Sequence, residues 1–147
     1  MKLSTRTRYG TRAMLYLAPS YEKGPISIKE IADHQQLSPK YLETLMATLR
    51  AAGLVRSARG AQGGHMLARP PDQITLRQIY TALEGPEKLV DCTADPQVCD
   101  RSGTCVTLEV WAQLYDACME VLESITLEDL AHRAREKQGL SAIMYHI

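Results

Sequence analysis

The chain of 147 residues contains no phenylalanine and one tryptophan, and aromatic residues make up only 5% of it. A protein that stacks the bases of a single strand on a row of aromatic rings is therefore disfavoured. The sequence also lacks the run of about 18 uncharged apolar residues that a membrane-spanning helix needs. Its first ten residues have no apolar core like that of a signal peptide. We therefore expect a cytoplasmic protein without a membrane span, long enough for one ordinary domain.

The chain has no net charge, yet its two halves are oppositely charged. Residues 1–69 hold 11 Lys or Arg against 4 Asp or Glu, whereas residues 70–147 hold 6 against 13. A basic half attracts phosphate and an acidic half avoids it, so this asymmetry favours nucleic-acid binding by the first half. The alternative is two solvated surfaces that merely differ in charge.

The first half has the start and stop signals of a helix-turn-helix. Apolar residues at helical spacing predict a helix over residues 9–17. A capping box that starts at Ser27 predicts a short helix to about residue 36. A Ser-Pro pair then opens a second short helix over residues 38–53. Two short helices with a tight connection are typical of the motif whose second helix enters the major groove of DNA.

A glycine-rich hairpin is predicted to follow these helices. Residues 54–57 and 65–68 have strand character, and the segment between them is too rich in glycine for a helix. This order of elements is that of a winged helix-turn-helix. Arg59 at the hairpin tip could enter a narrow minor groove, or it could lie on a mobile surface loop. The glycines do not form a nucleotide-binding P-loop, because its Lys-Ser/Thr pair is absent.

The candidate DNA contacts lie on the polar face of the second helix, at its cap and at the hairpin tip. They are Ser38, Lys40, Tyr41, Glu43, Thr44, Arg50 and Arg59. Glu43 has two interpretations. A carboxylate near phosphates is costly unless it accepts a hydrogen bond from a specific donor such as cytosine N4, so Glu43 either reads a base or is an ordinary surface charge.

The second half predicts a helix over residues 75–83, a segment of little periodicity, and a long helix. Apolar residues from Leu108 to Ile125 recur every three or four positions, as in a helix that packs on a partner helix. A further start signal at Thr126 predicts a short helix through Ala131. The fold class is therefore mainly α with a small β-hairpin. We expect a DNA-binding domain over 1–84, a loop over 85–106, a dimerisation helix and short following helix over 107–132, and a partly disordered tail over 133–147.

Three of the four cysteines fall in the loop, at Cys92, Cys99 and Cys105. In a reducing compartment such clustered thiols indicate metal ligands or redox groups. Zinc is disfavoured because no Cys-x2-4-Cys pair is present, and an iron-sulfur cluster suits the wider spacing. A thiol-disulfide switch, zinc and inert thiols remain as alternatives. Cys118 belongs to the apolar seam of the long helix and is expected to be a small buried hydrophobe.

Particular strings of the sequence resemble the iron-sulfur-cluster-sensing winged-helix repressors, which include IscR, NsrR and RirA, with CymR as a relative that lacks the cluster. The resemblance covers about residues 1–132. The matching strings are MKLST at 1–5, RYG at 8–10, AML at 13–15, Ser38 with YLE at 41–43, LR at 49–50, GLV at 53–55, RG at 59–60, GG at 63–64, the three loop cysteines and Trp111.

The resemblance implies a homodimer, formed by crossing the long carboxy-terminal helices, that sets two winged helices on a palindromic operator in double-stranded DNA. The half-sites would lie about one helical turn apart, near 34 Å. It also implies that Tyr41 and Glu43 lie on the recognition helix and that Arg59 lies in the minor groove. The three loop cysteines would hold the cluster.

The sequence departs from its relatives at the fourth cluster ligand. Leu108 stands where IscR has a ligand histidine, and Arg8 stands where NsrR-like members have an aspartate. The oxygen donors Glu109, Asp91 and Thr107 are the remaining candidates. A 2Fe-2S cluster is favoured over a 4Fe-4S cluster. The expected function is a non-enzymatic transcriptional regulator that senses redox, iron-sulfur or nitric oxide status. The alternative is a winged-helix regulator without a cluster, which uses thiol-disulfide chemistry, zinc or a partner protein.

Overall fold

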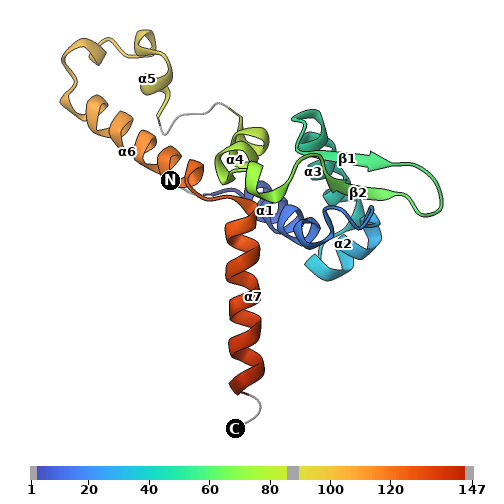
Figure 1. Cartoon of the computed structure of the whole chain (residues 1–147). Helices are drawn as coiled ribbons and strands as arrows, with labels where there is room; N and C mark the ends of the chain where they lie inside the picture. The colour runs from blue at the N-terminus through green and yellow to red at the C-terminus, as the bar shows by residue number, and fades with distance from the viewer. Residues whose placement is uncertain (1–2, 86–89, 145–147) are drawn as a thin grey trace.

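The computed structural model describes the backbone of residues 3–85 and 90–144 and the side chains of residues 3–85 and 90–138. A helical head with a projecting hairpin is followed by two long helices that diverge from it (Figure 1). The elements in order are α1 (Thr5–Leu17), η1 (Ala18–Ser20), α2 (Ile28–Gln35), α3 (Pro39–Ala51), β1 (Val55–Ala58), β2 (Gly64–Leu67), η2 (Pro71–Gln73), α4 (Leu76–Glu84), α5 (Asp91–Ala94), η3 (Pro96–Val98), η4 (Ser102–Thr104), α6 (Val106–Glu123) and α7 (Leu127–Met144).

Hydroxyl side chains start the helices of the head. The Ser38 Oγ accepts the backbone N–H of Tyr41 at 3.2 Å and thereby caps α3, as the Ser-Pro pair predicts. Ser27 caps α2 in the same way, accepting from the N–H of Glu30. The Glu30 carboxylate accepts from the hydroxyl of Tyr16 at 3.2 Å, which ties α2 to α1. The helix-turn-helix is therefore set by local capping and by a contact between helices.

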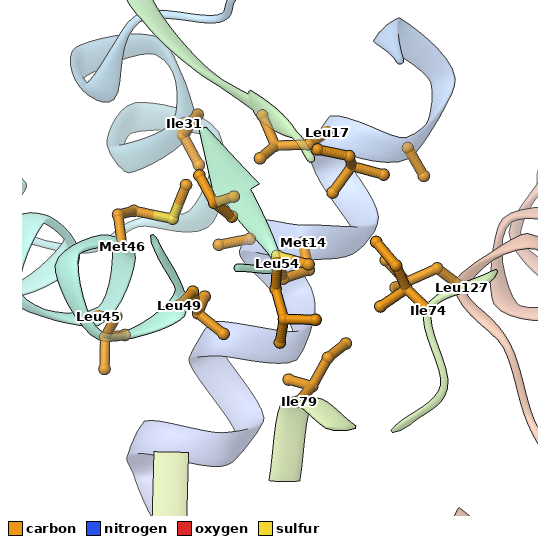
Figure 2. Packing of buried hydrophobic residues seen from close by; sticks show 14 of the residues in the cluster. Met14, Leu17, Ile31, Leu45, Met46, Leu49, Leu54, Ile74, Ile79 and Leu127 are labelled. Atoms are coloured by element: carbon orange, nitrogen blue, oxygen red, sulfur yellow. The ribbon is translucent and has the colours of Figure 1, made fainter. Parts of the chain in front are cut away.

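One apolar core holds the head together (Figure 2). Met14 of α1, Ile31 of α2 and Leu49 of α3 are fully buried in it. Leu127 of α7 is buried in the same cluster and lies beside Ile74 (Figure 2). The junction between α6 and α7 is thus anchored on the head by packing. Two backbone hydrogen bonds strengthen this anchor, from Leu76 N–H to Ile125 O and from Leu127 N–H to Ile74 O, both at 2.9 Å.

The hairpin is a two-stranded antiparallel sheet with Val55 opposite Leu67 and Ala58 opposite Gly64. Its tip projects from the head beyond α3 (Figure 1). Gly64 is required by a close approach, because a Cβ there would lie 2.2 Å from the carbonyl oxygen of Ile26. The first residue of β2, next to the hairpin turn, is thus pressed against the segment that precedes α2.

The carboxy-terminal third differs from the sequence prediction in two respects. The helix expected to end near Ala131 continues as α7 to Met144, so most of the predicted tail is helical. The expected loop is partly ordered into the short turns α5, η3 and η4. Residues 86–89 and 145–147 of the predicted loop and tail lie outside the described residues. Among the helices described, none combines the length and the apolar character needed to cross a membrane.

Candidate nucleic-acid interface and cysteine segment

The structure places the predicted DNA contacts of residues 38–50 on one helix. Ser38 caps α3, and Lys40, Glu43, Thr44 and Arg50 are exposed along it. The Thr44 hydroxyl donates to the carbonyl of Lys40 at 3.2 Å, so its oxygen can still accept. The opposite face of α3 is buried in the core and fixes the rotation of the helix. The predicted polar side chains are therefore available together on the solvent face.

Tyr41 contacts Tyr9, a residue that the sequence did not mark as part of this surface. The ring of Tyr9 on α1 meets the ring of Tyr41 edge-on, with centroids 6.3 Å apart. The guanidinium groups of Arg8 and Arg12 lie 5.9 and 5.8 Å from the centroid of the Tyr9 ring. The basic start of α1 thus adjoins the start of α3. Tyr9 has helical spacing with the core residues, and that spacing alone could not reveal its contact with the recognition helix.

The Lys and Arg side chains of the described part of the head form no close ion pairs, although the charge of Arg6 helps to lower the pKa of Glu84. Within residues 3–85, no Lys or Arg side chain forms an ion pair with Asp or Glu; the two ion pairs seen in the described residues both lie on α7. Exposed cations without local partners are the arrangement that phosphate contacts need. The exposed members on α1, α3 and the hairpin are Arg6, Arg8, Arg12, Lys40, Arg50, Arg56 and Arg59.

The hairpin brings its own polar groups to this surface. Arg59 directly follows β1 and is exposed. His65 of β2 shares a 3.1 Å hydrogen bond between its Nδ1 and the Ser57 hydroxyl. Burial and the positive charge of Arg50 lower the pKa of His65, and the negative charge of Glu43 opposes this shift. His65 was not singled out from the sequence. It lies close enough to α3 for the charges of Arg50 and Glu43 to act on its pKa.

The three loop cysteines lie at three successive turns. Cys92 is in α5, Cys99 follows η3 and Cys105 is the N-cap of α6. All three are half-buried free thiols. Cysteine thiolates are the usual ligands of an iron-sulfur cluster, so these three side chains have the chemistry that such a cluster needs. In the described part of the chain, however, no three Cys, His, Asp or Glu side chains are gathered closely enough to hold a metal ion. Cys118 is half-buried on α6, less covered than the apolar seam predicts.

The oxygen donors predicted as fourth ligand lie at the starts of two different helices, Thr107 and Glu109 on α6 and Asp91 on α5. The Cys105 Sγ lies 3.2 Å from the Thr107 hydroxyl, and Glu109 is exposed in the first turn. Asp91 is exposed at the start of α5. The hydrogen bond from Thr107 and the backbone N–H of Leu108 lower the pKa of Cys105, which favours its thiolate.

Known proteins match nearly the whole chain. The sequence profile described as "Rrf2: Iron-dependent Transcriptional regulator" matches residues 3–133. The chain belongs to the Rrf2 family. It is 44% identical over 147 residues, the full length of both chains, to the HTH-type transcriptional regulator CymR of Bacillus subtilis. The solved structure of that global cysteine regulator has a TM-score of 0.75 and 44% identity, covering 90% of this chain and 98% of the other. T. potens IscR has a TM-score of 0.77 and 44% identity, covering 94% and 91%.

Membership in the Rrf2 family identifies the protein as a helix-turn-helix transcriptional regulator that binds DNA, and not an enzyme. The resemblance predicted from the sequence is confirmed, as is the mainly helical fold with one hairpin. CymR and IscR are both among its relatives with solved structures, so membership leaves open which signal this Rrf2 regulator senses.

Proposed function

We propose that this Rrf2 regulator is a dimeric repressor in the cytoplasm that reads a palindromic operator with α3 and the hairpin of each subunit. The observation that carries the proposal is the surface of α1, α3 and the hairpin, where exposed Lys and Arg side chains form no close ion pair with a carboxylate. Lys40, Thr44 and Arg50 would enter the major groove, and Arg59 would enter the minor groove. Glu43 would accept a hydrogen bond from a base.

The dimer is supported by an apolar stripe on α6. Val106, Val110, Leu114 and Val121 are 79%, 53%, 47% and 59% exposed and recur at helical spacing. Large exposed apolar surfaces are costly in water, and a second copy of α6 would cover this one. The amino-terminal part of α6 stands clear of the head, whereas its carboxy-terminal end lies against α4 (Figure 1). A dimer built on α6 would leave both α3 helices free for DNA.

The cysteine segment is proposed to carry the signal, with Cys92, Cys99 and Cys105 as thiolate ligands of a 2Fe-2S cluster. Support comes from three free thiols within one segment, beside the helix proposed to form the dimer. Such a cluster would supply a prosthetic group whose binding responds to iron, sulfide and oxidants. The turns α5, η3 and η4 would have to move to bring the three sulfurs together. Glu109, Asp91 or Thr107 would complete the ligand set.

Anaerobic reconstitution with iron and sulfide tests the cluster. We expect a visible absorption spectrum and stoichiometric iron and sulfide in the wild-type protein and in Cys118→Ser. Both should be lost in Cys99→Ser. A colourless wild-type protein without iron, or a cluster unaffected by Cys99→Ser, would rule out this ligand set.

A second candidate is a regulator that signals through its thiols without a cluster. Two observations favour it: the described residues gather no three metal donors, and Thr107 and the Leu108 amide favour the thiolate of Cys105. Mass spectrometry after mild oxidation distinguishes the two candidates. The thiol candidate requires a reversible disulfide or adduct at Cys105 that changes DNA affinity in protein free of iron.

A further inference from the structure

A second site, remote from the cysteines, lies between α7 and the two helices α1 and α2. Here the structure has a cavity of about 530 Å³, within the size range of small-molecule sites. Its apolar lining comes from Leu15, Ile26, Ala131 and Ala134. Its polar lining includes two arginines from different helices, Arg12 of α1 and Arg135 of α7. The cavity exists because Leu127 and Ala131 anchor α7 on the head core and bring the next turn of α7 over α1.

Both arginines are held in place and keep unused donors. Arg12 donates from Nε to the Gln35 side-chain oxygen at 2.9 Å and from a terminal nitrogen to the Gln35 carbonyl at 3.4 Å. Arg135 pairs with Glu128 at 2.8 Å through one terminal nitrogen. A guanidinium group has five N–H donors, so each arginine retains several for a ligand. Two guanidinium groups that line one cavity suit a carboxylate or sulfonate.

The remaining polar groups of the cavity leave the N–H donors of the two arginines available to an anionic ligand. Glu30 lines the cavity, but its carboxylate accepts from the Tyr16 hydroxyl at 3.2 Å. Burial, together with Glu30, raises the pKa of Tyr16, so this hydroxyl stays protonated and keeps donating. The rings of Tyr16 and His34 stack with their centroids 4.2 Å apart and their planes 34° apart, and both line the cavity. The two arginines are balanced by the carboxylates of Glu30 and Glu128. The preference for an anion therefore depends on the unused N–H donors of Arg12 and Arg135 beside an apolar and aromatic surface.

We infer that this cavity binds a small amphipathic anion, an aromatic or aliphatic acid whose acidic group meets Arg12 and Arg135. The apolar body of the ligand would lie against Leu15, Ile26 and Ala131. Because α2 packs on α3 and α7 continues from α6, such a ligand would connect the DNA-reading helices with the proposed dimer helix. The inference goes beyond the proposed function, and its binding step depends on neither the cluster nor DNA.

Fluorescence titration of the full-length protein with anilinonaphthalene sulfonate, an aromatic anion, tests the site. We expect binding that weakens about tenfold in Arg12→Ala and in Arg135→Ala, which each remove a charge-assisted hydrogen bond. Ala134→Phe should block binding by filling the cavity. The matched control is Arg133→Ala, the neighbouring arginine of α7 that does not line the cavity. It should bind the probe like the wild type.

Competition separates an anion site from a merely apolar one. Phenylpropionate should displace the probe, and its neutral amide should not. The inference is overturned if the wild type does not bind the probe, if Arg12→Ala and Arg135→Ala bind it as tightly as Arg133→Ala, or if acid and amide compete equally. Thermal melts of every variant identify loss of folding, and Arg135→Lys, which keeps the charge, should retain most of the affinity if the fold is intact.

Discussion

Ile26 and His65 exchange two backbone hydrogen bonds, 2.9 Å from Ile26 N–H to His65 O and 2.8 Å from His65 N–H to Ile26 O. This pair joins the loop before α2 to strand β2 of the hairpin. The helix-turn-helix and the wing are therefore coupled through the backbone. A winged head with this coupling holds α3 and the hairpin in a fixed relative position.

Replacing Gly64 should break this coupling. In Gly64→Ala the new Cβ would lie 2.2 Å from the Ile26 carbonyl oxygen, so the backbone must shift. We expect a loss of about 1–3 kcal/mol in the free energy of unfolding, the usual cost of overpacking, and weaker DNA binding. Urea denaturation measures the first effect. Gly103→Ala, where a Cβ meets no atom within 4 Å, is the matched control and should leave stability nearly unchanged. Equal stability of the two variants would contradict the coupling.

Arg59→Ala should weaken binding to a selected operator duplex. Removing one phosphate or minor-groove contact makes the free energy of DNA binding less favourable by about 1–3 kcal/mol. It also reduces by about one the slope of the logarithm of the binding constant against the logarithm of the salt concentration. Fluorescence anisotropy at several salt concentrations measures both quantities. The control is Arg133→Ala on α7, which is exposed and distant from the hairpin. Unchanged affinity and slope in Arg59→Ala would remove the hairpin from the DNA interface.

A charge on the apolar stripe of α6 should separate the subunits. Leu114→Lys places an ammonium where the proposed dimer buries a side chain that is 47% exposed in the single subunit. Analytical ultracentrifugation should then find a monomer, with weaker binding to a two-site duplex. Glu120→Lys changes charge more strongly at an exposed position outside the stripe and should remain dimeric. A dimeric Leu114→Lys would show that another surface forms the dimer.

Stability should fall in acid partly because of Glu84. Burial raises the pKa of Glu84, but hydrogen bonds from the Ser4 and Thr7 hydroxyls outweigh it, and the net shift is downward from 4.5. The unfolded chain therefore binds more protons in this range, and the stability that Glu84 provides above pH 4.5 is lost as the pH falls through its folded pKa. Urea melts of Glu84→Gln should depend less on pH than those of the wild type. An identical pH dependence in the two proteins would exclude this role.

The local signals in the sequence predicted most of the head well, although α1 begins at Thr5, four residues before the predicted start at residue 9. Serine caps, the Ser-Pro start and helical periodicity depend on neighbouring residues, so α2, α3 and the hairpin were predicted within one or two positions. Contacts between distant segments could not be read in this way. Tyr9 against Tyr41, Ile26 against His65 and Ser4 against Glu84 exist only after folding. The length of α7 was wrong because its mixed polar sequence has no single apolar face, and Leu127 and Ala131 anchor only its first turns.

The placement of the DNA contacts followed from helical spacing, because residues on the polar face of α3 share a surface once Leu42, Leu45 and Leu49 are buried. The roles of these contacts stay predictions. The same holds for the loop cysteines, since their spacing predicts a shared ligand but cannot fix how three short turns approach each other.

The central claim is that the cysteine segment controls how the basic head binds DNA. The most direct test measures affinity for one selected operator duplex, under anaerobic conditions, with the reconstituted protein and with the same preparation after its iron is removed. The account predicts affinities that differ by about tenfold or more, and no such difference in Cys99→Ser. Equal affinity of the two wild-type forms would contradict it.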